Sequence, residues 1–168
     1  MLFKKILLVY LLMGFVTIGN AQSKAERKKE KAEKALAAYN EFKSLVDSGS
    51  YIFKADWVTT AKGRSINIQS GNYHLKVEDG KAEGSLPYFG VSQSAGYGQA
   101  AGIAFNADTR DYKVKYNDKK RRATINMNID AKDEKLQIIM NASAGGSSIS
   151  VSSSRRNSIR YNGMITKL

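Results

Sequence analysis

The stretch ATINMNIDAKDEKLQIIMNASAGGSSISV (residues 123–151) alternates apolar and polar side chains over three successive runs. The apolar positions are Ile125, Met127, Ile129, Leu136, Ile138, Met140, Ile149 and Val151. Alternation of this kind is typical of strands with one face in a core and one in water. The links between the runs are too short for parallel crossovers, which need a dozen or more residues. The stretch therefore predicts antiparallel strands joined to their neighbours in the sequence.

The same alternation extends outward from this stretch, between residues 51 and 165. Asp79-Gly80 separates two of the runs and is a strong hairpin signal. In the first run, Tyr51, Phe53, Ala55 and Trp57 are expected to share the buried face. We predict a mainly β domain over residues 49–168, with about eight or nine antiparallel strands in a meander that forms a small barrel or strongly curved sheet. A two-sheet β-sandwich is the alternative.

One α-helix is predicted ahead of the sheet, within residues 22–48. Its first half, residues 23–34, consists almost entirely of Ala, Glu, Lys and Arg, which favour helix without giving an apolar stripe. In the second half, Leu36, Tyr39, Phe42 and Val46 recur at spacings of three and four. This amphipathic half is expected to pack on the β domain, and Gly49 is expected to follow the end of the helix.

Residues 1–21 have the layout of a secretory signal peptide. Two lysines, Lys4 and Lys5, precede a short apolar run, and small residues up to Ala21 supply the cleavage site. Cleavage there would lower the formal net charge from +12 to +10. The sequence contains no cysteine, so the chain is not a lipoprotein. These features predict a periplasmic or secreted protein with no membrane-spanning segment in its mature form.

Composition excludes several chemistries. The absence of cysteine removes disulfides, thiol catalysis and thiolate metal sites. The single histidine, His74, is expected on the surface. The carboxylates of the β region considered for acid–base chemistry are Asp56, Asp108 and Asp111, and the last two are expected in a turn beside Arg110. We predict no metal site, no cofactor and no catalytic residues, with a small hydrolase as the least favoured alternative.

Two basic clusters, residues 119–122 (KKRR) and 155–156 (RR), raise the question of a polyanion partner. A plain meander places successive turns at alternate ends of the sheet, so the clusters are expected at opposite ends. Residues 155–156 are then expected near Asp130, Asp133 and Glu134. This placement disfavours nucleic-acid binding, and no binding motif is present. Contact with an anionic surface through the Lys/Arg-rich helix stays open.

Residues 85–106 (SLPYFGVSQSAGYGQAAGIAFN) interrupt the alternation with a long connection that holds the only proline of the chain. The motif LPYFG at residues 86–90, the later Tyr97-Gly98 pair and residues 102–105 (GIAF) resemble the signature of an uncharacterised family. It is a domain-of-unknown-function family of exported proteins from Bacteroidetes-type bacteria. The resemblance implies export and a single domain, and it implies no activity, ligand or catalytic residue.

The same connection contains the candidate ligand-binding residues Tyr88, Phe89 and Tyr97, because long loops on rigid β scaffolds are common binding elements. A structural role is the alternative, in which these aromatic residues close one end of the barrel. We therefore expect an exported, non-catalytic envelope protein whose β domain binds a small ligand or a protein partner. A structural or assembly factor that acts through the N-terminal helix is the alternative.

Overall fold

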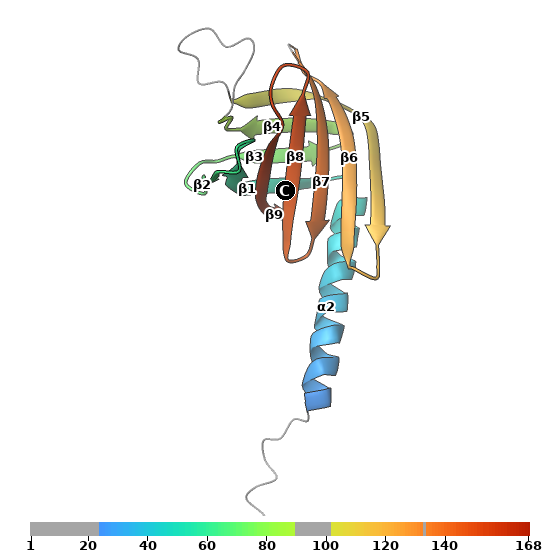
Figure 1. Cartoon of the computed structure of the whole chain (residues 1–168). Helices are drawn as coiled ribbons and strands as arrows, with labels where there is room; N and C mark the ends of the chain where they lie inside the picture. Colours follow the sequence, from blue (N-terminus) through green and yellow to red (C-terminus); the bar gives the residue numbers. More distant parts are fainter. Residues whose placement is uncertain (1–23, 90–101, 133) are drawn as a thin grey trace, which may run out of the picture. The chain divides into compact units, whose positions relative to one another are not determined.

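The computed structural model describes residues 24–89, 102–132 and 134–168, shown in Figure 1. The predicted signal peptide lies outside this part of the chain. The elements are α2 (Lys24–Asp47), β1 (Tyr51–Thr59), β2 (Ser65–Asn67), β3 (His74–Glu78), β4 (Lys81–Leu86), β5 (Ile103–Asn117), β6 (Arg122–Asp130), β7 (Lys135–Ser143), β8 (Gly146–Ser153) and β9 (Ile159–Thr166).

The strands form a closed antiparallel barrel. Each strand from β3 to β9 pairs with the next along the chain, and β1 pairs with both β3 and β9. The barrel therefore has eight strands, β1 and β3 to β9. The short strand β2 pairs with the C-terminal end of β1, at residues 57–59. In Figure 1, β6, β7, β8 and β9 lie side by side and cross in front of β1, β3 and β4. The expected meander is confirmed as a barrel.

Local chemistry explains the hairpin between β3 and β4. Asp79 and Gly80 have φ angles of 50° and 76°. Two left-handed residues in succession form the type I′ turn, whose twist matches that of the flanking strands. This confirms the Asp79-Gly80 hairpin.

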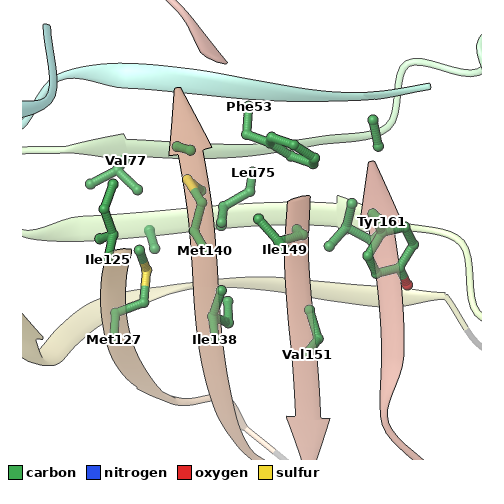
Figure 2. Close-up of a cluster of buried hydrophobic side chains, with 14 of the residues drawn as sticks. Phe53, Leu75, Val77, Ile125, Met127, Ile138, Met140, Ile149, Val151 and Tyr161 are labelled. Atoms are coloured by element: carbon green, nitrogen blue, oxygen red, sulfur yellow. The ribbon is translucent and has the colours of Figure 1, made fainter. Parts of the chain in front are cut away.

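Apolar side chains from all eight barrel strands fill the interior. An eight-stranded barrel is just wide enough for its side chains to fill. In Figure 2, Phe53 and Leu75 lie on one side of the core, and Met140, Ile149 and Tyr161 come from the strands on the other. All five are completely buried. Close packing of this kind holds the cysteine-free fold together.

The helix is continuous over the predicted range, and only its second half contributes to the core. The chain divides into two compact units, residues 1–36 and 37–168, so the second half of α2 belongs to the barrel unit. Tyr39, Phe42 and Val46 are buried, as expected. Leu36 is 49% exposed, so its placement on the buried stripe is wrong. Gly49, at a φ of 64°, follows the helix end as predicted.

Polar contacts fix the second half of α2 against the β5–β6 hairpin. The Tyr39 hydroxyl donates to Asp118 Oδ1 at 2.8 Å, and Lys43 Nζ lies 3.2 Å from the same oxygen. Burial and this hydrogen bond raise the pKa of Tyr39 to about 12. The two donors lower the pKa of Asp118, Tyr39 being the larger cause. The Tyr116 hydroxyl also donates to Asp47 Oδ1 on the helix, at 2.5 Å.

Two boundaries differ from expectation around the long connection. Ser85 and Leu86 belong to β4, and the residues from Ile103 belong to β5. The connection is therefore residues 87–102.

Asp108 and Asp111 do not lie in a turn, because β5 continues to Asn117 with a register shift between Arg110 and Lys113. A bulge interrupts the alternation of apolar and polar residues but does not end the strand. The interrupted alternation in this part of β5 therefore resembled a turn in the sequence.

Candidate functional site on the outer wall

A β-bulge in β1 turns Trp57 outward. Ala55 pairs with Gly163 of β9 and Trp57 with Asn162, so Asp56 is an extra residue between them. The bulge inverts the alternation: Val58 is fully buried and Trp57 is 45% exposed. The expectation that Trp57 faces the interior is therefore wrong. Bulges often re-aim a side chain beside a functional site.

The bulge depends on a glycine in the opposite strand. A Cβ placed on Gly163 would lie 1.9 Å from the carbonyl oxygen of Lys54 and 3.1 Å from the Cα of Ala55. No larger residue fits between these strands without moving the backbone of β1. Gly163 thus permits the close approach that accompanies the bulge.

The outward side chains of β6–β9 form three rows in register. The first row is Thr124, Asn141, Ser148 and Asn162; the second is Asn126, Ile139, Ser150 and Arg160; the third is Asn128, Gln137 and Ser152. We call these eleven residues the neutral wall. Arg160 is its single charged member. On β6, charged residues occur only at the two ends of the strand, at Arg122 and Asp130.

The other strands carry a different surface. Outward positions of β3, β4 and β5 include Lys76, Glu78, Lys81, Glu83, Asp108, Arg110, Lys113 and Lys115. We call these eight residues the charged wall. The barrel therefore has one wall of ordinary solvated charges and one of amides and hydroxyls. In a chain with 25% charged residues, this segregation marks the neutral wall as the unusual surface.

A shallow depression of about 220 Å³ lies at the first row. Its lining includes Asn141, Ser148, Asn162 and Arg122. The Thr124 hydroxyl donates to Asn141 Oδ1 at 3.1 Å. Trp57 lies opposite Asn162 on the next strand, and Asn162 lines this depression. Side chains directly opposite each other on paired strands lie about 4.5–5.5 Å apart at their Cβ atoms, so these two groups contact the same ligand if one binds here.

Two of the three predicted aromatic site residues, Tyr88 and Phe89, belong to the described part of the chain. Tyr88 is half-buried, packs on the core and donates from its hydroxyl to the Asn157 carbonyl at 3.2 Å. Phe89 is 44% exposed. Tyr97 lies outside the described residues. The Tyr161 hydroxyl donates to the Pro87 carbonyl at 2.7 Å, which ties this connection to the core.

The same end of the barrel contains an ion pair with little exposure to solvent. Arg156 Nη2 lies 3.1 Å from Glu134 Oε1, and the two side chains are only 16% and 9% exposed. The Arg156 guanidinium also lies over the Tyr88 ring, 5.3 Å from its centroid. The predicted proximity of residues 155–156 to Glu134 is confirmed for Arg156. Arg122 instead lines the depression near the β7–β8 turn, at the opposite ends of these strands.

Two carboxylates, Asp111 and Asp130, line a depression of about 370 Å³ together with the three residues of the third row. Asp130 pairs with Arg110, and Asp111 accepts a hydrogen bond from the Asn128 amide at 3.0 Å. Both carboxylates are therefore engaged with neighbouring donors. Asp108 lies opposite Lys81 on the charged wall.

The described residues contain no group of three or more His, Cys, Asp or Glu side chains placed to hold a metal ion. His74 lies on the surface side of β3, as expected, with its Nε2 3.9 Å from Glu83. No described helix is long and apolar enough to cross a membrane.

Sequence reasoning missed the neutral wall, although its signal was present. Asn126, Asn128 and Gln137 occupy the polar positions of runs whose alternation was recognised. A count of charges at those positions would have separated these strands from the lysine-rich β5. Trp57 had no such signal, because its exposure depends on the bulge.

Comparison with known proteins places the chain in a family. No curated protein matches the sequence. A crystal structure of a DUF4251 family protein from Bacteroides eggerthii has the same fold, with a TM-score of 0.63 and 13% sequence identity; the alignment covers 80% of this chain and 91% of that one. The sequence itself matches the domain of unknown function DUF4251 over residues 29–165. The chain therefore belongs to the DUF4251 family, whose function is unknown.

Proposed function

We propose that the protein is an exported, non-catalytic binding protein of the cell envelope that binds an uncharged partner on its neutral wall. The observation that carries this proposal is the segregation of charge between the two walls. Burying a charge without a partner costs far more than burying a hydrogen-bonded amide or hydroxyl. A surface of amides and hydroxyls therefore suits contact with a partner that offers no charges of its own.

The packing of the barrel supports an external site. Interior positions are occupied by large side chains such as Tyr51, Phe53 and Met140, which are completely buried. Barrels that carry small ligands keep their interior open. A filled barrel acts through its outer surface.

Export rests on the signal-peptide layout of residues 1–21, and the lack of cysteine fits a released protein. A periplasmic or secreted protein meets envelope polymers and other exported proteins. The non-catalytic part of the proposal rests on the residue types, because the sequence contains no cysteine and a single histidine.

A matched pair of charge substitutions tests the binding surface. Ser150→Lys places a lysine in the middle of the neutral wall, and Asn106→Lys places one at an outward position beside the charged wall. Purified variants are sedimented with the envelope fraction of the producing bacterium. We expect wild type and Asn106→Lys to co-sediment and Ser150→Lys to stay in the supernatant. Equal behaviour of the two variants would contradict the proposal.

The connection after β4 is a second candidate surface, favoured by the exposure of Phe89 next to the anchored Tyr88. Phe89→Ala in the same assay tests it, because Phe89 has little packing to lose. A role for the charged helix is tested by deleting residues 22–34, whose described members are all exposed. Loss of envelope binding in either variant, with Ser150→Lys still bound, would move the site away from the neutral wall.

A further inference from the structure

One uncharged row continues beyond the neutral wall around the barrel. Asn162 pairs with Trp57 on β1, and Trp57 pairs in turn with Asn67 on β2. The full row is Thr124, Asn141, Ser148, Asn162, Trp57 and Asn67, from six successive strands. Neighbouring strands lie about 4.8 Å apart, so the row extends about 24 Å along the surface. We call it the tryptophan row.

We propose that the tryptophan row binds an uncharged carbohydrate chain, with Trp57 packing against a sugar ring and the flanking amides bonding its hydroxyls. This inference rests on the proposed binding function of the neutral wall and names the ligand class.

The residue types match the chemistry of a neutral sugar. A sugar hydroxyl both donates and accepts a hydrogen bond, and so do the amides of Asn141 and Asn162. The C–H face of a sugar ring is apolar and flat, which suits the exposed surface of an indole. Trp57 stands between two asparagines, Asn67 and Asn162, so stacking and hydrogen bonding are available at adjacent positions of one row.

The geometry also provides a place for one ring. The depression of about 220 Å³ is lined by Asn141, Ser148 and Asn162, three consecutive members of the row, together with Arg122. It is smaller than the pockets of about 300–1,000 Å³ that enclose drug-sized ligands. A shallow site of this size fits one unit of a chain that continues along the surface.

Other classes of partner suit this row less well. Protein interfaces are enriched in aromatic residues and Arg at their centre and depleted in Ser, whereas the neutral wall has serines on β8 and no aromatic member, Trp57 lying beside it on β1. Nucleic-acid binding needs many cations, and Arg160 is the single charge of the neutral wall. Arg160 Nε lies 3.4 Å from the Ser150 hydroxyl, so it lies along the wall.

Binding is tested on the purified chain with neutral oligosaccharides (cello-, malto-, xylo- and manno-oligosaccharides), with heparin as the anionic comparison. Trp57 is the only tryptophan, so its fluorescence reports binding directly in the wild type. Calorimetry then compares variants that lack the indole. We expect a blue shift with at least one neutral series, and affinity lowered about tenfold or more in Trp57→Ala, with partial recovery in Trp57→Phe.

A matched pair of isosteric charge variants localises the site. Asn162→Asp places a carboxylate in the tryptophan row, and Asn106→Asp places one on the opposite side of the barrel. We expect the first to lose binding and the second to retain it. Binding of heparin alone, no binding of any neutral series, or unchanged affinity in Trp57→Ala would overturn the carbohydrate assignment. If Ser150→Lys still abolished envelope binding, the proposed function would stand with a protein as its partner.

Discussion

Replacing Gly163 with alanine should break the bulge that exposes Trp57. The new Cβ would lie 1.9 Å from the Lys54 carbonyl oxygen, whereas real Cβ contacts stay above about 3.0 Å. The β1–β9 pair must then open by about 1 Å. Hydrogen bonds of the ladder near the contact would stretch beyond their usual 2.7–3.2 Å range. Overpacking costs about 1–3 kcal/mol, and each weakened backbone bond adds about 0.5–1.5 kcal/mol.

We therefore expect Gly163→Ala to lower the free energy of unfolding by about 3 kcal/mol, which corresponds to a fall in Tm of roughly 6–12 °C. Thermal and urea unfolding followed by circular dichroism measure this loss. Trp57 emission should shift as well, because the bulge that sets its exposure is displaced. Gly145→Ala is the control, since a Cβ added at Gly145 would meet no atom within 4 Å. Equal stability of the two variants, with unchanged Trp57 emission, would refute the reasoning.

Three further predictions concern stability. Arg121 has a φ of 51°, a left-handed conformation that glycine adopts without strain, so Arg121→Gly should stabilise the fold by about 1 kcal/mol. Arg122→Gly is the control: it places glycine in strand β6 and should destabilise the fold by about 0.5–1 kcal/mol. Urea unfolding of the two variants measures the difference. The folded pKa of Tyr39, about 12, exceeds its ordinary value of 10.0, so its contribution is complete below pH 10 and is lost as the pH rises toward 12. The Tm of Tyr39→Phe should therefore fall less than that of wild type over this window, and equal falls would contradict the assigned cause. Glu134→Ala removes one side of the largely buried Arg156–Glu134 ion pair and should cost about 3 kcal/mol in chemical unfolding, because breaking such a pair from one side is strongly destabilising. A loss below about 1 kcal/mol would show that the pair is solvated.

The candidate site was only partly accessible from the sequence. Tyr88 and Phe89 were recognised because an aromatic loop breaks the alternation. The structure shows that Tyr88 is engaged with Asn157 and the Arg156 guanidinium, contacts between segments nearly 70 residues apart. No local pattern contains that information. Of the two candidate residues that the structure describes, Phe89 keeps the exposure expected of a binding residue.

The order of residues was enough to predict the number and antiparallel pairing of the strands, the amphipathic half of the helix and the Asp79-Gly80 hairpin. These features follow from local physical chemistry: side chains alternate across a strand, and a turn needs residues that tolerate positive φ. The closure of the barrel by β1 and β9 emerged only in three dimensions. So did the bulge opposite Gly163 that turns Trp57 into solvent, and the alignment of asparagines and serines from distant strands as one surface with a single charge. All three features depend on the register between strands that are far apart in the chain. That register is fixed by packing across the whole barrel, which no local stretch of sequence contains.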